Sequence, residues 1–273
     1  MMNKKLGLLL IRGSGESGFD RQERFIERLE RRLTQRGVNT GNIQFEIVDW
    51  YGPLQLQQES VLDRMQAANI KLKARLTRKL IITNIGDLIT YGGKPNFPSH
   101  GYEETHKLVH KSMVALKSKL VDNAPLVILA SSMGTEIINN YVWDRQRAVN
   151  PDPMGNSPFE RFETLTGLFT FGSNLPIFAA SHTIDSLVPI AFPSPNLQAE
   201  LLPKAVWENY YDKNDSMGYP IKALNSHYAN ANVTDIQINT GGILTFWNLL
   251  SHFGYWKSKK LVRRIASYIQ EVI

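Results

Sequence analysis

Short apolar runs alternate along the chain with longer segments in which apolar residues recur at helical spacing. A continuous run of roughly four to eight apolar residues is typical of a buried strand, and apolar residues at every third or fourth position indicate an amphipathic helix. The alternation predicts an α/β fold with a mostly parallel, six-stranded sheet flanked by helices. The expected strands span residues 6–11, 43–50, 126–131, 165–171, 205–211 and 235–239, and the expected helices span residues 20–36, 102–120, 135–147 and 257–272.

Two long connections interrupt this alternation, residues 51–101 and residues 172–204. Long connections in compact α/β proteins are commonly lids or binding loops. We therefore expect a single domain over residues 1–273, in which 51–101 is a candidate cap or lid insertion and 172–204 is a second long, lid-like loop.

The composition of the chain excludes several kinds of site and of targeting segment. The chain has 273 residues, 42% of them apolar, which is enough for a substantial core. It has no cysteine, so disulfides, thiolate metal sites and cysteine nucleophiles are excluded. The apolar run from Leu6 to Ile11 is too short for a secretory signal, and no window approaches the ~20 apolar residues of a membrane span. We expect a cytoplasmic protein.

The net charge of +6 raises the question of an acidic partner. In residues 20–36, arginines alternate with glutamates around an apolar stripe, which is typical of a solvated helix face. Residues 71–79 form a basic run without acids, so peripheral contact with an acidic membrane stays an option. No nucleic-acid-binding motif accompanies the charge, and we expect no nucleic-acid partner.

The segment LVILASSMGTEIINNYVW, residues 126–143, runs from a predicted strand through Ser132 into a predicted helix. Small residues, Ala130 and Gly134, stand two positions before and two positions after the serine. This pattern indicates a nucleophile elbow, a strained strand-to-helix turn that needs small neighbours. Backbone N–H groups at the start of the helix would stabilise the negative charge that develops during acyl transfer. A helix N-cap serine without chemistry is the alternative.

The loop from Gly13 to Gly18, GSGESG, follows the first predicted strand and has two interpretations. Its glycines satisfy the G-x-G-x-x-G pattern of a dinucleotide-binding loop, although Glu16 would place a carboxylate beside the pyrophosphate. Alternatively, the loop lies beside the elbow, and the backbone N–H groups of Ser14 and Met133 form an oxyanion hole.

With these residues the chain resembles the α/β-hydrolase superfamily over essentially its whole length, in the short form that lacks the first two antiparallel strands. TFGSNLPIF and HFGYW resemble its lipase-like members. The family order of oxyanion loop, serine, acid and histidine implies Asp215, in YYDKNDSMGYPI after the fifth strand, as the acid, with Asp212 in reserve. It implies His252, in SHFGYW beyond the last strand, as the base.

The resemblance implies a serine hydrolase that cleaves a small-molecule or lipid ester through an acyl-enzyme, with Ser132 as nucleophile and no metal or organic cofactor. Carboxylester, thioester, lactone and phospholipid substrates all stay open. A catalytically silent hydrolase-fold binding protein is the main alternative, because Arg12 stands where many members have histidine and Ala130 replaces the first elbow glycine. A dinucleotide-dependent enzyme using Gly13 to Gly18 is the other.

Overall fold

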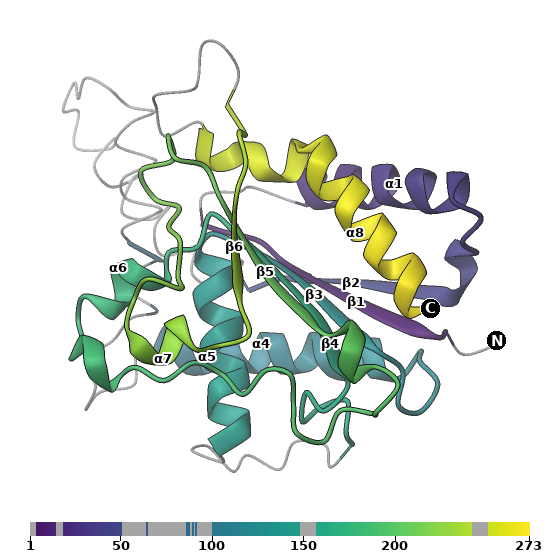
Figure 1. Ribbon diagram of the computed structural model, residues 1–273, viewed down its shortest axis with the longest axis horizontal. Helices are drawn as coiled ribbons and strands as arrows, with labels where there is room; N and C mark the ends of the chain where they lie inside the picture. The colour runs from purple at the N-terminus through teal and green to yellow at the C-terminus, as the bar shows by residue number, and fades with distance from the viewer. Residues whose placement is uncertain are drawn as a thin grey trace.

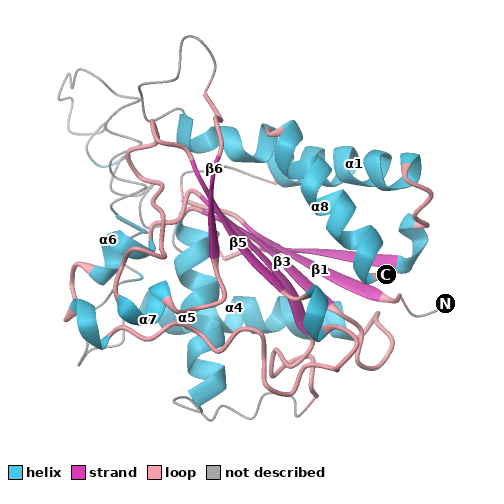
Figure 2. Cartoon of the chain, viewed as in Figure 1, coloured by secondary structure: helices cyan, strands magenta, loops and turns pink. Residues whose placement is uncertain are grey.

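A six-stranded, wholly parallel sheet forms the centre of the protein (Figures 1 and 2). The computed structural model describes residues 4–14, 19–50, 64, 86, 87, 89, 91, 100–147, 157–241 and 251–273. The α/β architecture with six strands flanked by helices is confirmed. In spatial order the strands are β2 (Ile43–Val48), β1 (Leu6–Ile11), β3 (Leu126–Ser131), β4 (Leu165–Phe171), β5 (Val206–Tyr211) and β6 (Thr234–Gln237).

Helices cover both faces of the sheet, as Figure 1 shows. Two helices that are far apart in sequence, α1 and α8, pack together on one face, and α4 and α5 lie on the other. None of the helices in the described ranges combines the length and apolarity that a bilayer span requires. The long helices are α1 (Asp20–Gln35), α4 (His100–Lys117), α5 (Met133–Arg147) and α8 (Lys259–Val272), and the short ones are α6 (Leu175–Ala179) and α7 (Ser226–Ala229).

Strand β1 shows how the sequence builds both layers. All six of its residues are buried. Because successive side chains of a strand point to opposite faces, Leu8 and Leu10 join the core beneath α1 and α8, while Leu9 and Ile11 join the core beneath α4 and α5. A continuous apolar run is therefore required where helices cover both faces.

The strand order reverses at β1. The chain passes from β1 to β2 on one side, then crosses to β3 on the other side of β1. In parallel sheets, ligands bind at such a switch point, beyond the carboxyl ends of the strands. The residues that follow β1, Arg12 to Ser14, and the residue that follows β3, Ser132, both lie at this point.

Several element boundaries differ from the prediction. Strand β2 ends at Val48 rather than Trp50, because the Trp50 indole N–H donates to the Arg12 carbonyl at 2.9 Å. Helix α4 spans His100–Lys117, and Leu120 instead forms a bridge with Lys4. Helix α5 begins at Met133, α8 begins after the N-cap Ser258, and β6 spans Thr234–Gln237.

The two long connections have different outcomes. Residues 172–204 are not a plain loop, because they contain α6 and the short 3-10 helices η2 (Ile184–Ser186) and η3 (Leu202–Lys204). Most of the expected cap, residues 51–101, lies outside the described residues. Within it, Tyr91 is buried and its ring centroid lies 5.0 Å from that of Tyr102 on α4.

Candidate active site

Ser132 occupies a strained turn between β3 and α5. Its φ is +52°, in the left-handed region that non-glycine residues seldom adopt. Three hydrogen bonds hold the turn: the Ser132 N–H donates to the Phe171 carbonyl at 3.0 Å, and the Thr135 N–H and hydroxyl donate to the Ser132 carbonyl at 2.8 and 2.7 Å. Such strain persists only where the surroundings fix it, and it is typical of functional turns.

Two glycines allow the loop after β1 to approach this turn. A Cβ at Gly13 would lie 2.5 Å from the Ser132 Cβ, and a Cβ at Gly134 would lie 2.7 Å from the Arg12 carbonyl oxygen. Neither separation is sterically possible without movement of the backbone. Gly134, two positions after Ser132, therefore allows the loop after β1 to pack against the start of α5.

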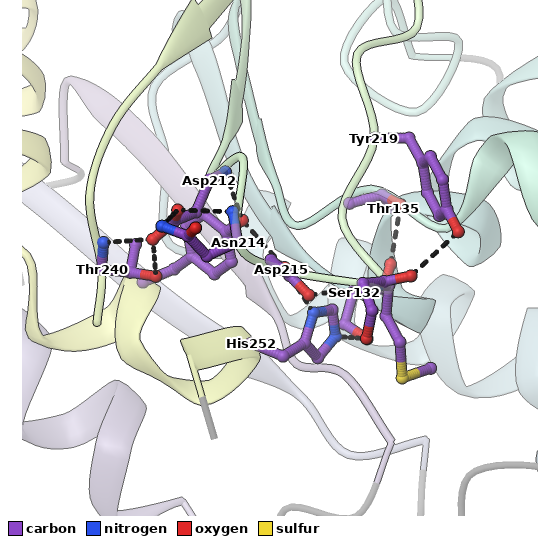
Figure 3. A network of polar contacts seen from close by, with 11 residues as sticks. Ser132, Thr135, Asp212, Asn214, Asp215, Tyr219, Thr240 and His252 are labelled. Atoms are coloured by element: carbon purple, nitrogen blue, oxygen red, sulfur yellow. Dashed lines mark hydrogen bonds and ion pairs between the residues drawn. The ribbon is translucent and has the colours of Figure 1, made fainter. Parts of the chain in front are cut away.

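His252 reaches Ser132 from the carboxyl-terminal part of the chain. It lies on η4 (Ser251–Lys257), a 3-10 helix that immediately precedes α8. Its Nε2 is 2.6 Å from the Ser132 Oγ, and its Nδ1 is 2.7 Å from the Asp215 Oδ2 (Figure 3). All three side chains are buried. The structure thus brings together the serine, the histidine and the acid that the sequence suggested.

Asp215 is held by donors on both carboxylate oxygens. The Met217 N–H donates to Oδ1 at 2.9 Å, and the Tyr255 hydroxyl donates to Oδ2 at 2.9 Å, beside His252. Gly218 follows closely, and the space for its Cβ is taken by the carboxylate. These contacts hold the Asp215 carboxylate against the imidazole, so the turn after β5 orients the acid.

Asp212, the reserve candidate, serves a different purpose. Its Oδ2 accepts from the Thr240 N–H and from the Thr240 hydroxyl at 2.9 Å, and its Oδ1 accepts from the Asn214 N–H at 3.0 Å. Burial favours the neutral carboxyl, but the donors on Thr240 and Asn214 outweigh it and hold the pKa of Asp212 below its ordinary value. Asp212 ties the acid turn to the end of β6 and makes none of the described contacts to His252.

Tyr255 was not among the predicted catalytic residues, although its place near His252 suggested that it lines a pocket or anchors the last helix. Its hydroxyl donates to Asp215 and accepts from the Asp212 N–H at 2.9 Å, so it joins the two aspartates. Burial and the Asp215 charge raise the pKa of Tyr255, which keeps the hydroxyl protonated. A signal existed in the sequence, because residues three apart in a 3-10 helix share one side and Tyr255 follows His252 by three positions.

Gly172 is a second residue that sequence reasoning missed. It follows β4 with φ +60°, and a Cβ there would lie 3.1 Å from the His252 Cε1 and 2.8 Å from the Tyr255 ring. Its N–H donates to the Tyr210 carbonyl at 2.9 Å. Only a residue without a side chain leaves room for the imidazole between β4 and η4.

The two candidate oxyanion donors flank the serine. Met133 is the first residue of α5, and the first N–H groups of a helix have no carbonyl one turn earlier to receive them. Ser14 is buried and follows Gly13, whose Cα abuts Ser132. Arg12 anchors this loop: its guanidinium lies 3.3 Å from Asp49 and 4.9 Å from the centroid of the Phe19 ring.

The dinucleotide-binding interpretation concerns the loop from Gly13 to Gly18, of which the structure describes Gly13 and Ser14. Residues 15–18 lie outside the described residues. Gly13 itself packs against Ser132, so the close approach of the serine accounts for this glycine without a dinucleotide.

A buried carboxyl group lies one helical turn behind the serine. Glu136 on α5 accepts from the Asn140 side-chain amide at 2.9 Å, and burial raises the pKa of Glu136 to about 7. Asn140 also donates to the Tyr91 hydroxyl at 3.3 Å, which lies 3.1 Å from His106. Burial, aided by Arg145, lowers the pKa of His106 to about 3.

The arrangement of Ser132, His252 and Asp215 has a defined chemical capacity. An imidazole within hydrogen-bond reach of a hydroxyl can take its proton, and a carboxylate on the other ring nitrogen fixes the tautomer and stabilises the imidazolium. No protein-family model matches the chain, and no curated protein matches it. The geometry of these side chains therefore carries the functional inference.

Proposed function

We propose that the protein is a serine hydrolase of the α/β-hydrolase fold that cleaves acyl esters. The observation that carries the proposal is the hydrogen-bonded chain from Ser132 Oγ to His252 at 2.6 Å and on to Asp215 at 2.7 Å, starting from a serine with φ +52°. A helix N-cap serine explains the strand-to-helix position but not the histidine and the acid behind it. The three residues also follow the chain order serine, acid, histidine typical of that fold.

In the proposed mechanism, His252 removes the Ser132 proton as Oγ attacks the carbonyl carbon of the ester. Collapse of the tetrahedral intermediate breaks the bond to the alcohol, which takes the proton back from His252. Water, deprotonated by His252, then attacks the acyl-serine, and the carboxylic acid leaves as Ser132 regains its proton. Asp215 stays ionised and stabilises the imidazolium in both halves.

The backbone N–H groups of Met133 and Ser14 are assigned to the oxyanion. Met133 contributes the start of α5, where the helix dipole favours negative charge. Ser14 contributes the loop that Gly13 and Gly134 bring against the serine. Because the loop is anchored by Arg12, the donors are positioned before substrate arrives, which is what such stabilisation requires.

The substrate is assigned as an ester with an apolar acyl group. The connection after β4 exposes Ile177, Ile184 and Val188, at 36 to 42% of their surface, close in sequence to the carboxyl end of β4. Exposed apolar side chains on the connection that starts at the carboxyl end of β4 suit an apolar acyl chain better than a charged one. Under this proposal the connection 172–204 lines the acyl-binding part of the site.

Ester turnover with detection of the intermediate tests the proposal. Mixed with p-nitrophenyl butyrate, the protein should release nitrophenol, and rapid quenching with peptide mass spectrometry should find a butyryl group on Ser132. Ser132→Ala should show neither. A folded wild-type protein that gives no turnover and no acyl-serine across a series of acyl lengths would instead favour the silent binding protein.

A further inference from the structure

Helices α1 and α8 lie side by side on one face of the sheet (Figure 1). Residues of both helices line a cationic groove. Its volume is about 450 Å³, within the range of small-molecule sites. None of the described residues that line it is acidic. The lining residues are Arg28, Arg31, Arg32 and Gln35 of α1, with Lys259, Val262 and Arg263 of α8.

The groove was invisible in the sequence. Along α1, arginines and glutamates alternate, which predicted a mixed, solvated face. Residues 28, 31, 32 and 35 share one side of a helix, however, whereas residues 23, 27 and 30 share another. Packing of α8 beside the arginine side then adds Lys259 and Arg263, more than 200 positions away in the chain. Glu27 remains next to Arg28 but does not line the groove.

Two arginines show how the groove is built. The Arg28 guanidinium donates to the carbonyl oxygens of Trp256 and, at 3.2 Å, Lys257, so it is fixed between α1 and the end of η4. Arg32 donates through Nη1 to the Gln35 side chain at 3.2 Å. The Nε of Arg32 is buried and has no acceptor among the residues that the structure describes. Arg32 as a whole is half-buried and lines the groove, so the residue stays accessible to an anion.

We infer that this groove binds a small oligophosphate, a ligand with at least two linked phosphate groups. The five cations of the groove, Arg28, Arg31, Arg32, Lys259 and Arg263, require several negative charges in a small volume. A phosphate group supplies between one and two charges and oxygens that match the guanidinium fork, whereas carboxylates supply one charge each.

A membrane surface fits this face less well. Peripheral helices combine basic residues with apolar side chains that enter the lipid. Of the large apolar side chains exposed in the described ranges, none lies on α1 or α8, and Ile273 directly follows α8. Neither helix therefore presents a large exposed apolar side chain that could enter a lipid layer.

Calorimetry with inorganic tripolyphosphate tests the inference. Wild-type protein in about 0.1 M salt should bind one tripolyphosphate, and the affinity should fall as salt rises. Arg32→Gln/Arg263→Gln should weaken binding at least about tenfold, because it removes charged hydrogen-bond donors. Lys111→Gln/Lys204→Gln is the matched control: it removes the same charge from exposed sites on α4 and η3, outside the groove, and should bind like wild type.

The outcomes separate the alternatives. Equal affinities for all three proteins, or no tripolyphosphate binding by the wild type, would overturn the inference. Binding to phosphatidylglycerol vesicles without tripolyphosphate binding would also overturn it, in favour of a membrane surface. Thermal melts should show that both double variants are folded. The readout is binding rather than turnover, so it does not depend on the role of Ser132.

Discussion

The Ser132 Oγ lies 2.6 Å from the His252 Nε2, although 120 positions separate the two residues in the chain. Strand β3 carries the serine to the switch point of the sheet, and η4 carries the histidine to the residues that follow β4 and β5, Gly172 and Asp212. Gly172 leaves room for the imidazole, and Asp215 and Tyr255 hold it from behind. A short hydrogen bond between residues this distant requires the whole carboxyl-terminal half of the sheet to be in register.

Substitution of Asp215 should mainly lower activity, whereas substitution of Asp212 should mainly lower stability. Asp215→Asn should lower kcat by on the order of 10⁴-fold, because an amide no longer holds the imidazole in the reactive tautomer. Asp212→Asn should mainly lower stability, by about 1–3 kcal/mol, because it disrupts bonds from Thr240 and Asn214. Kinetics and urea denaturation of both variants check this. A larger kcat loss for Asp212→Asn would mean that the acid is misassigned.

Tyr255→Phe should reduce kcat about tenfold with little change in KM, because it removes a donor to Asp215 that positions the base. Tyr268→Phe is the control, since it deletes a buried hydroxyl on α8 that packs near Phe169. Steady-state kinetics on the two variants provide the measurement. If both variants lose the same activity, or if only KM changes for Tyr255→Phe, the hydroxyl does not position the acid.

Gly13→Ala should reduce kcat/KM about a hundredfold or more, because the added Cβ would lie 2.5 Å from the Ser132 Cβ and must displace the turn. Gly37→Ala, with φ +77° and no heavy atom within 4 Å of the new Cβ, should cost roughly 1–2 kcal/mol of stability and no activity. Comparison of activity per folded molecule tests the close approach. Full activity in Gly13→Ala would contradict it.

Glu136→Gln should change how stability depends on pH. The pKa of Glu136 is raised from 4.5 in the unfolded chain to about 7, so the folded state keeps a proton that the unfolded state loses in that window. As pH rises from about 4.5 to 7, this group therefore removes up to about 3 kcal/mol of the free energy of unfolding. Glu136→Gln has no carboxyl group that releases a proton on unfolding. Over this pH range its free energy of unfolding should therefore rise relative to that of the wild type by up to the same amount.

Titration of His106 changes stability with pH in the opposite direction. Its pKa is lowered from 6.5 to about 3, so the unfolded state binds the extra proton and stability rises with pH across that range. In the wild type, the pH dependence of stability from His106 opposes that from Glu136. Glu136→Gln should therefore show only the rise in stability with pH that His106 causes. Urea denaturation at several pH values measures it. Parallel pH profiles for wild type and Glu136→Gln would show that Glu136 is not protonated in the folded state.

The strands were the most predictable part of the fold. The bounds of β1, β3 and β4 matched the prediction, because strands covered on both faces are buried along their whole length and consist mainly of apolar residues. Their polar residues, Ser131, Thr166 and Thr170, are too few to hide the pattern. The predicted end of β2 was wrong, because Trp50 lies outside the strand and its indole N–H donates to the Arg12 carbonyl. Partial burial of β2 and β6, at the sheet edges, gives a weaker pattern than the central strands do.

In the site, the residues that carry the chemistry were predictable and those that support them were not. Ser132 stands in a local strand-to-helix pattern, and chain order pointed to Asp215 and His252. The contacts of Tyr255 and the clearance at Gly172 depend on how η4 crosses the sheet. The groove between α1 and α8 likewise exists only in three dimensions, because it joins two distant segments.

Covalent labelling with a fluorophosphonate tests the central claim most directly. The reagent reacts with a serine only when a base has activated it. Wild-type protein should be labelled on Ser132, and Ser131→Ala, which removes the adjacent buried serine, should be labelled as well. Ser132→Ala should take up no label, and His252→Ala should react far more slowly. Labelling of Ser132→Ala to the wild-type extent, or no labelling of folded wild-type protein, would contradict the account.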